Sequence, residues 1–401
     1  MRWLVLSLSL SMAACGARPR PLPPAPAPDP LEIDAAALQR DDPKCARKVA
    51  RSAHAYFRYT NRPFVDLVCD RYASAITTMP LVHAHGDAHL EQYAVAAEGR
   101  GLADYDASAV GPPVVDLARF ATSLVLAAPD QASSRAAIQA LLQGYEQSLE
   151  DPSIVVSEPA AATRIRARFP PTPVEWLDRV EKLILPMPEE ERPAYDDSWS
   201  DFVAQMRERD PAIDPAFFKI KVGGRIESGI GSSHVEKFLV RIEGPSEAPD
   251  DDLVMEAKGL EPGSLGRCMR GADLDAMRVI LGQAQISAAP QRFLAAVQIK
   301  GKPFYSHTWL VHYTELGPRD VKSGAELAEI AQDVGVQLGR GHAKVADPAL
   351  EEAQRRALRK ALESIRPTLE STAFELGEMV TRSWRTYLKK TNRVGWSRAH
   401  P

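Results

Sequence analysis

The sequence lacks several features that would assign it to a particular class of protein. Its net charge is only −4, so no general basic surface indicates a nucleic-acid partner. No fixed-period repeat is apparent, which argues against a solenoid or propeller. Beyond the first 15 residues, no apolar segment approaches the roughly 20 residues of a membrane-spanning helix. With 45% hydrophobic and 25% charged residues, the 401-residue chain has the composition of a globular protein with two or three folding units.

The N-terminus departs from this composition. A short apolar run follows Arg2, and two alanines precede Cys15. The run is too short to span a bilayer and has the form of a signal-peptide core. Residues 1–15 resemble a bacterial lipoprotein leader, which implies cleavage before Cys15, lipidation of its thiol and anchoring in the cell envelope, in the outer membrane because no Asp follows Cys15. The alternative is a mis-assigned start, with Cys15 a buried or disordered cysteine of a cytoplasmic chain.

A proline-rich segment follows the leader. Residues 16–33 contain seven prolines between Pro19 and Pro30. Such a tract favours extended polyproline II and cannot form a packed core. We expect it to be a tether that holds the folded part away from a membrane.

Cysteine is scarce in the rest of the chain. After Cys15 only Cys45, Cys69 and Cys268 remain, so at most one disulfide is expected. The pair Cys45–Cys69 is a guess.

The remaining sequence is helical, then sheet-rich, then helical, which predicts an α+β fold. Apolar residues at spacings of three and four predict that residues 34–215 are mainly helical, with a helical insertion or connector at 151–215. Within this part, residues 80–85 and 102–106 are short strand-like pieces. Residues 216–318 contain runs typical of strands, and residues 319–401 form long helical patterns.

Acidic residues follow the two strand-like pieces of the first part. Asp87 lies just after one piece, and Asp104 and Asp106 end the other. Phosphoryl transfer requires a carboxylate that orients the attacking hydroxyl, together with oxygen ligands that hold Mg²⁺ on the phosphates. These residues supply that set, with Asp87 as the base and with Asp104, Asp106 and the amide oxygen of Gln92 as candidate metal ligands.

The same segment resembles known phosphotransferases. His85-Gly-Asp87-Ala-His89, followed by an Asp-Tyr-Asp motif, is similar to the loops of aminoglycoside-phosphotransferase-like kinases. More closely, it resembles a widespread bacterial family of uncharacterised function, whose signature is Gly-Asp-x-His-x-x-Asn-Phe-Gly followed by Asp-Phe-Asp. The resemblance runs from about residue 44 to 347. It implies a two-lobed, kinase-like fold in which Asp87, His85 and His89 are catalytic.

Further positions extend this resemblance. Residues 56–58 are similar to the family's Phe-Tyr-Arg-Gly, and residues 111–119 continue the kinase-like pattern. The resemblance implies that Arg58, Asp116 and Arg119 support the site. Gln92 stands where the family carries Asn.

The phosphate-binding half lies downstream. Residues 228–242 resemble a Gly-rich loop between two strands, in which Gly229, Gly231 and Ser232 contact nucleotide phosphates. Lys258, on the following strand, resembles the lysine that pairs with those phosphates. This half precedes the catalytic loop in ordinary kinases, so the resemblance implies a circularly permuted kinase-like domain that uses ATP and Mg²⁺.

A late motif has no assigned role. Residues 339–347 resemble the family's Ala-Arg-Ala-His-Ala-Arg-Ser-Gly-Asp, which places His342 at the family's histidine. The alternative interpretation of His342 is a histidine that packs between helices.

Two other functions remain open alongside an ATP- and Mg²⁺-dependent transfer to an unknown hydroxyl acceptor. An inactive kinase-like binding module on the cell envelope is suggested by export, by Gln92, and by His234 where the family tends to have a third glycine. A metal-dependent hydrolase is suggested by His83, His85, Asp87 and His89, which are similar to a His-x-His-x-Asp-His motif, although Ala88 interrupts its spacing. The expected partners are a nucleotide, an acceptor and, through the lipid, a membrane, with no nucleic acid.

Overall fold

The computed structural model describes residues 28–226 and 235–393, apart from the single positions 261, 264, 273, 290 and 318. The predicted leader with Cys15, most of the tether, and the loop residues Gly229, Gly231, Ser232 and His234 lie outside the described residues. In the parts of the chain that the structure describes, no helix is long and apolar enough to cross a membrane.

The fold is α+β, and its largest sheet has six antiparallel strands. The strands lie in the order β5-β6-β7-β8-β10-β9, so the last two are exchanged relative to the chain order. Their bounds are Leu185–Pro186 for β5, Ile220–Arg225 for β6, Lys237–Ile242 for β7, Leu253–Gly259 for β8, Ala295–Ile299 for β9 and Lys302–Thr308 for β10. All but β5 lie in the region predicted to be sheet-rich.

Helices pack against this sheet, and one of them lies in the chain between two of its strands. Helix α10 (Arg192–Arg209) buries Phe202 and Met206 with apolar residues of the sheet in a second, smaller core. Helix α11 (Ala276–Ile286) lies in the chain between β8 and β9 and contacts both β9 and β10. No helix was predicted from the sequence over the residues of α11. The region 151–215, predicted to be a helical insertion or connector, also contains α8 (Ala160–Arg166) and α9 (Pro173–Glu181).

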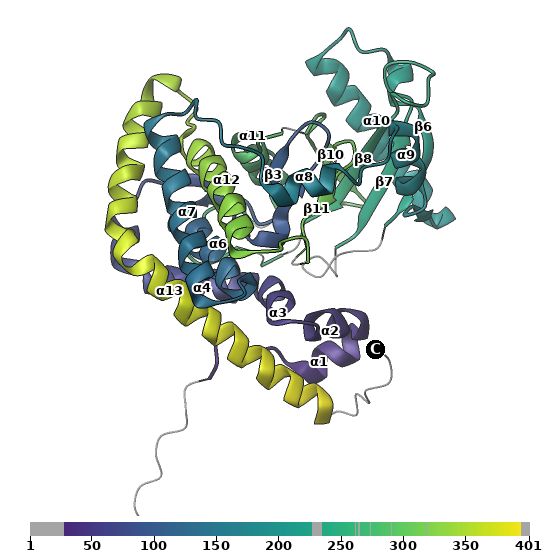
Figure 1. Cartoon of the computed structure of the whole chain (residues 1–401). Coiled ribbons are helices and arrows are strands. Elements are labelled where there is room, and N and C mark those ends of the chain that lie inside the picture. The colour runs from purple at the N-terminus through teal and green to yellow at the C-terminus, as the bar shows by residue number, and fades with distance from the viewer. Residues whose placement is uncertain are drawn as a thin grey trace, which may run out of the picture.

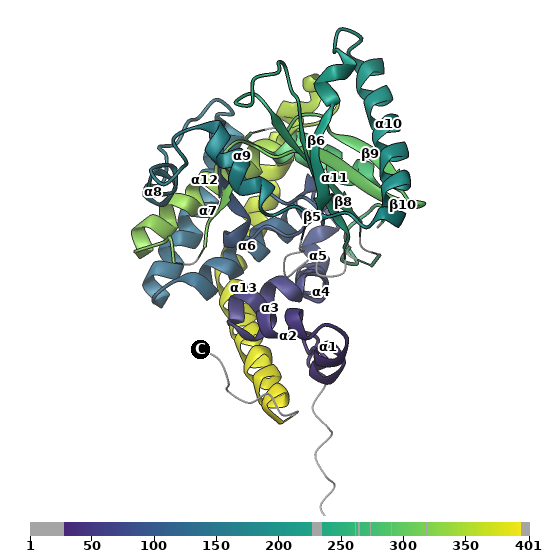
Figure 2. The same cartoon turned by 90° about the vertical axis from the view of Figure 1, so that its right-hand side faces the viewer.

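The helical part carries the main core. Figure 1 shows the sheet with α9 and α10 on one side of the molecule and α6, α7, α12 and α13 on the other. These four helices span Val114–Ala127, Gln131–Glu150, Gly324–Ala343 and Glu351–Arg393. In Figure 2 five short N-terminal helices lie below α7 and α12 and beside the lower part of α13, namely α1 (Ala35–Asp41), α2 (Pro43–Ala50), α3 (Ala53–Tyr59), α4 (Asn61–Arg71) and α5 (Ala73–Ile76).

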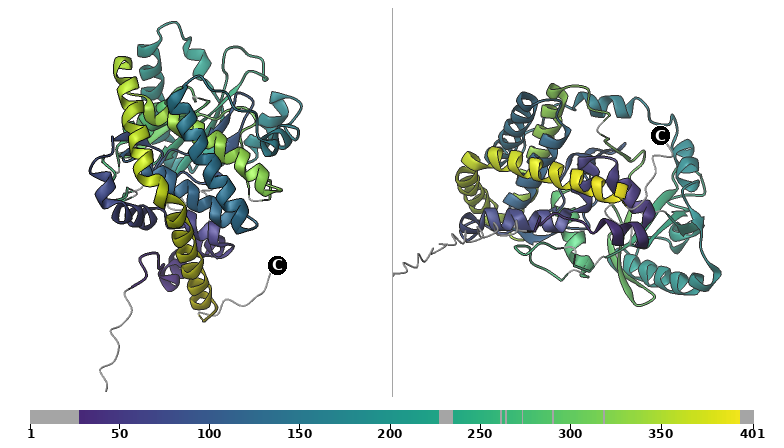
Figure 3. Two further views of the ribbon diagram at one scale, coloured as in Figure 1. Left: turned by 60° about the vertical axis from the view of Figure 1, so that its left-hand side comes forward. Right: turned by 90° about the horizontal axis from the view of Figure 1, so that it is seen from below.

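Helix α13 links the parts of this helical region. It is 43 residues long, packs along α6 and α7, and reaches the N-terminal helices, as both views of Figure 3 show. The indole Nε1 of Trp384 donates to the Ala50 carbonyl over 3.1 Å, and the Tyr387 hydroxyl donates to the Ala46 carbonyl over 3.2 Å. These bonds fix the C-terminal helix to α2.

Helices α7 and α12 approach each other very closely. A Cβ atom at Gly144 would lie 2.2 Å from the Gln332 carbonyl oxygen, and one at Gly335 would lie 2.2 Å from the Leu141 carbonyl oxygen. Only glycine permits this backbone approach. The close packing places the C-terminal end of α12 beside the segment predicted to be catalytic.

The disulfide prediction was wrong. Cys69 on α4 pairs with Cys268, 199 residues away, and Cys45 is a buried cysteine outside this disulfide. The disulfide joins the helical part to the segment between β8 and α11. Polar contacts surround it, because Arg267 forms ion pairs with Asp66 and Asp70 of α4.

Candidate functional site

Small strands organise the predicted catalytic segment. Strand β1 (Val82–Ala84) pairs with β4 (Ala109–Gly111), so the chain leaves and re-enters the same short ribbon. Between them lie η1 (Leu90–Gln92), β2 (Tyr93–Val95) and β3 (Arg100–Leu102), and β11 (Thr314–Glu315) pairs with β2.

The second predicted strand ends earlier than expected. Strand β3 stops at Leu102, and residues 104–106 form a loop. Asp104 has a φ of 61°, a left-handed conformation that a strand cannot contain. Its side chain meets Lys258 on β8 of the large sheet.

Asp116 fixes the loop that carries Asp87. Its two carboxylate oxygens accept from the backbone amides of His85 over 2.7 Å and Gly86 over 2.8 Å. Gly86 has a φ of 76°, and a Cβ there would lie 2.1 Å from the Ala107 carbonyl oxygen, so glycine is required. Asp116 is fully buried at the start of α6 and ties the loop to that helix.

His342 completes this buried network. Its Nε2 lies 3.0 Å from Oδ2 of Asp116, and its Nδ1 lies 3.0 Å from the Tyr145 hydroxyl. Burial disfavours ionisation of Asp116, but the hydrogen bond and charge of His342 outweigh burial and lower the pKa of this carboxyl below its usual range. The late motif thus supplies a partner for the loop.

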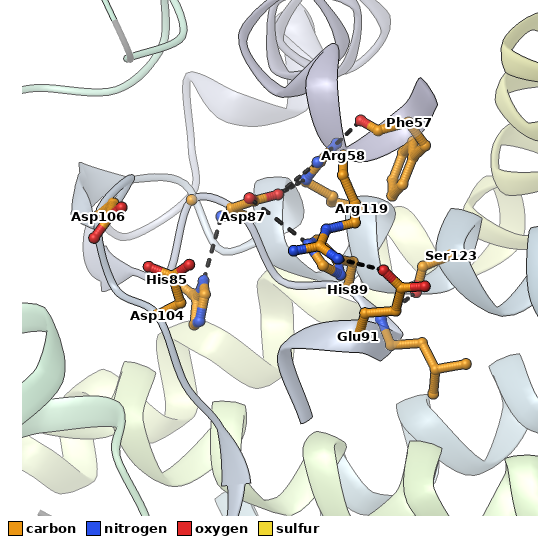
Figure 4. Close-up of polar contacts among 12 residues, drawn as sticks. Phe57, Arg58, His85, Asp87, His89, Glu91, Asp104, Asp106, Arg119 and Ser123 are labelled. Atoms are coloured by element: carbon orange, nitrogen blue, oxygen red, sulfur yellow. Dashed lines mark hydrogen bonds and ion pairs between the residues drawn. The ribbon is translucent and has the colours of Figure 1, made fainter. Parts of the chain in front are cut away.

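Asp87 lies against a buried arginine. Figure 4 shows the dashed interactions of Asp87 with Arg119 and with the ring of His85. Both Nε and a terminal nitrogen of Arg119 lie 2.5 Å from Oδ1 of Asp87. The guanidinium is fully buried, 4.0 Å from the centre of the Phe57 ring. Burial raises the pKa of Asp87, and the charge of Arg119 opposes this rise.

The two predicted catalytic histidines are buried beside Asp87. Nε2 of His85 lies 2.9 Å from the Ala103 carbonyl oxygen, and its Nδ1 accepts from the Asp87 amide over 3.3 Å. The ring of His89 lies 3.7 Å from Oδ2 of Asp87. Burial, reinforced by the charges of Arg58 and Arg119, lowers the pKa of His89 well below its usual value, so this ring is neutral.

Arg58 reaches the same region from α3. It donates to Oε2 of Glu91 over 2.5 Å, and the other oxygen of Glu91 lies 3.5 Å from Nδ1 of His54. His54 and Glu91 were not predicted from the sequence. The sequence gives little reason to select them, because a lone His on a helix and a Glu in a loop are common in proteins.

Lys258 meets the second acidic loop. Its Nζ lies 2.6 Å from Oδ1 of Asp104 and also forms an ion pair with Asp106. The Tyr305 hydroxyl donates to the other oxygen of Asp106, and Arg278 of α11 donates to the Asp106 carbonyl oxygen. Predicted residues from the two halves of the chain are therefore brought together.

The charged groups of this cluster shift one another's pKa values. Burial disfavours charge on Asp104, but Lys258 outweighs it and lowers the pKa of Asp104 well below the usual range. Burial and the charge of Asp104 raise the pKa of Asp106 to about 6. Both carboxylates face the ammonium group of Lys258, which favours the charged form of each.

Gln92 lies directly before β2. It is buried at the end of η1, and its backbone carbonyl accepts from the Ala103 amide over 2.8 Å. In the described ranges, no group of three or more His, Cys, Asp or Glu side chains is arranged to hold a metal ion.

An open pocket of about 570 Å³ lies between the large sheet and the acidic loop. Its charged lining consists of Asp104, Lys237, Glu256, Lys258 and Glu315. Lys237 and Glu256 were not predicted as site residues from the sequence, although the period of two along β8 places Glu256 on the same face as Lys258.

The carboxylate of Glu256 is well supported within this pocket. Trp309 Nε1 donates to Oε2 over 2.8 Å, and Nε2 of His307 lies 3.3 Å from the same oxygen. Burial disfavours its charge, but Lys237 and His307 outweigh burial and lower the pKa of Glu256 to about 2.

Comparison with known proteins identifies one family. No curated protein and no solved structure matches the chain. The sequence model of DUF2252, described as uncharacterized protein conserved in bacteria, matches residues 43–153 and 158–390, and the chain therefore belongs to this family.

Proposed function

We propose that the protein is a kinase-like phosphotransferase that binds a magnesium nucleotide between the large sheet and the acidic loop and transfers a phosphoryl group to a hydroxyl acceptor. The observation that carries this proposal is the position of Lys258. Its ammonium group lies between Asp104 and Asp106, although Asp104 and Lys258 are 154 residues apart in the chain. In protein kinases a strand lysine and a metal-binding aspartate act on the same phosphates.

The side chains of the acidic loop fit a magnesium ion. Oxygens of Asp104 and Asp106 converge on the single ammonium of Lys258, and such hard oxygens are the ligands that Mg²⁺ prefers. Gln92 would add an amide oxygen. When bound, the ion would neutralise negative charge on the phosphoryl group that is transferred.

The order of elements in the sheet supports the proposal. Protein kinases place a Gly-rich loop before a strand lysine and the αC helix after that lysine. Here the β6–β7 hairpin precedes Lys258 on β8, and α11 follows. Gln283 of α11 lines the same pocket as Lys258. The arrangement resembles a kinase-like lobe that follows its catalytic loop, as in a circular permutation. Phosphate contacts by Gly229, Gly231 and Ser232 remain a prediction.

Asp87 is the proposed base. Arg119 holds Oδ1 and fixes the orientation of the carboxylate, which leaves Oδ2 to accept the acceptor's proton. His85 accepts a hydrogen bond from the Asp87 amide, and the neutral ring of His89 lies beside the Asp87 carboxylate. Both histidines are proposed to position Asp87.

A second candidate is a non-catalytic nucleotide-binding module. Arg119 already neutralises Asp87, and Gln92 is longer than the asparagine of the family signature. For either candidate we propose a lipid anchor at Cys15 in the cell envelope. The Cys69–Cys268 disulfide supports export, because disulfides persist mainly in oxidising compartments. A metal-dependent hydrolase has less support, since both ring nitrogens of His85 have partners.

ADP formation from Mg-ATP separates these candidates. The experiment uses the full chain with Cys15→Ser, which prevents lipidation, and compares it with Asp87→Asn and Asp104→Asn. A phosphotransferase should form ADP slowly even with water as acceptor, and both variants should abolish this. Nucleotide binding without ADP formation would indicate the binding module. Stabilisation by Zn²⁺ but not by Mg-ATP would refute both.

A further inference from the structure

We infer that Lys237 is a second phosphate-binding residue of this site, which acts beside Lys258 on the polyphosphate chain of a nucleoside di- or triphosphate. The inference rests on the proposed nucleotide site and adds to it a residue that no sequence motif indicated. It assigns to Lys237 a binding and positioning role.

The register of the sheet places the two lysines side by side. Lys237 on β7 pairs directly with Lys258 on β8 in antiparallel register. Residues directly opposite each other in this way have Cβ atoms about 4.5–5.5 Å apart on the same face of the sheet. Both side chains line the pocket of about 570 Å³.

This pairing is unfavourable unless an anion lies near it. Like charges directly opposite each other destabilise a sheet. The effect is greater here because the side chains of Lys237 and Lys258 are only 12% and 3% exposed. Lys258 is compensated by Asp104 and Asp106.

Lys237 lines the same pocket as the carboxylates of Asp104, Glu256 and Glu315, but among the described residues its ammonium group donates no hydrogen bond to them. Among the described residues, its one ion pair is with Oε1 of Glu256, over 3.9 Å, which is too long for a hydrogen bond. Glu256 instead accepts from Trp309 over 2.8 Å through its other oxygen. The ammonium of Lys237 therefore keeps its capacity to donate hydrogen bonds to a ligand.

The ligand that fits is a polyphosphate. Two adjacent ammonium groups match an anion that carries several charges on neighbouring groups, and charge-assisted hydrogen bonds to phosphate oxygens are the strong ones. Aromatic side chains of Tyr105, Trp309 and Tyr313 also line the pocket and offer surfaces for a base. A nucleoside without phosphates would not need Lys237.

Calorimetric titration tests the inference. The full chain with Cys15→Ser is titrated with Mg-ATP, Mg-ADP, tripolyphosphate and adenosine, and compared with Lys237→Met. The control is Lys302→Met on β10, whose side chain is 67% exposed and pairs with Glu236. Lys237→Met should weaken the binding of Mg-ATP and of tripolyphosphate about 10- to 100-fold, since hydrogen bonds to charged groups contribute about 1.5–3 kcal/mol. Its affinity for adenosine should be unchanged. Lys302→Met should bind all probes as the parent does.

The remaining outcomes of the titration separate failure of the inference from failure of the proposed function. If the parent binds Mg-ATP and Lys237→Met binds it equally well, the inference fails while the nucleotide site stands. If the parent binds none of the phosphate probes, the proposed function fails and the inference with it. If Lys237→Met does not fold, Lys237→Arg and Glu256→Gln replace it. Lys237→Arg keeps the charge and should preserve tripolyphosphate binding. The two roles differ for Glu256→Gln: a phosphate role predicts that it tightens tripolyphosphate binding, whereas a purely structural role predicts no change.

Discussion

Nε2 of His342 lies 3.0 Å from Oδ2 of Asp116, although 226 residues separate them in the chain. Both side chains are fully buried, and Asp116 in turn holds the amides of His85 and Gly86. The last turn of α12 therefore sets the position of the loop that carries Asp87. His342, to which the sequence alone assigned no role, therefore helps to hold the candidate site in place.

Removal of this histidine should destabilise the fold. His342→Ala leaves a buried carboxylate without its side-chain partner, and loss of one partner of a buried pair costs about 3–5 kcal/mol. Tyr145→Phe removes only the hydroxyl that contacts Nδ1 of His342, so it should cost about 1 kcal/mol. Urea unfolding measures both values. Equal, small losses in the two variants would argue against the network.

The Cys69–Cys268 disulfide should contribute to stability. It closes a loop with a sequence separation of 199 residues, and disulfides typically contribute about 2–4 kcal/mol. We expect a reductant to lower the unfolding free energy of the parent by this amount and to leave a Cys69→Ser, Cys268→Ser double variant unchanged. Cys45→Ala should retain the response to reductant. Peptide mapping that found Cys45 in a disulfide would contradict the pairing.

Arg119 should control the ionisation of Asp87. Burial already raises the pKa of Asp87, and Arg119 limits that rise. In Arg119→Met the pKa should rise further, so a higher pH is needed to form the carboxylate. Carbon-13 NMR of labelled aspartate measures this shift directly, with Asp87→Asn to assign the resonance. Arg58→Met is the matched control, because Arg58 bonds Glu91 rather than Asp87. A larger shift in the control would refute the assignment.

Mild acid should weaken the fold through His54. Burial, opposed by Glu91 and reinforced by Arg58 and Arg119, lowers the pKa of His54 from 6.5 to about 4. The stability that depends on the neutral ring is complete above pH 6.5 and is lost as the pH falls to about 4, by at most about 3 kcal/mol.

The test compares unfolding free energies between pH 7 and pH 4 for the parent and His54→Phe. The variant should show a shallower loss, because it has no ring to protonate. His83→Phe, at a half-buried ring, is the control and should retain most of the slope. An unchanged slope in His54→Phe would show that other groups govern acid sensitivity.

Local motifs made part of the site predictable from sequence. Asp87, Asp104 and Lys258 each lie in a short pattern with a chemical reason for its residue types, and the structure brings Asp104 and Lys258 together. The partners of these residues were not predictable in the same way. Asp116 and His342 meet only because α12 packs closely on α7, and the pairing of Lys237 with Lys258 depends on sheet register.

The errors in the fold have similar causes. Spacing alone carries no information on which of three cysteines pair, and Cys69 meets Cys268 through the packing of α4. Helix α11 was missed because it is short and lies between strands. The strand predicted to reach residue 106 ends at Leu102 because Asp104 adopts a left-handed conformation, which a short apolar-acidic run does not reveal.

The central claim is that the two parts of the chain form one nucleotide site at Lys258 and Asp104. The most direct measurement is the thermal unfolding midpoint of the Cys15→Ser chain with and without Mg-ATP, compared with Asp104→Asn and Lys258→Met. At about 100 times Kd the midpoint should rise by about 3 °C, the rise should require Mg²⁺, and both variants should lose it. No rise in the parent, or an equal rise in both variants, would contradict the account.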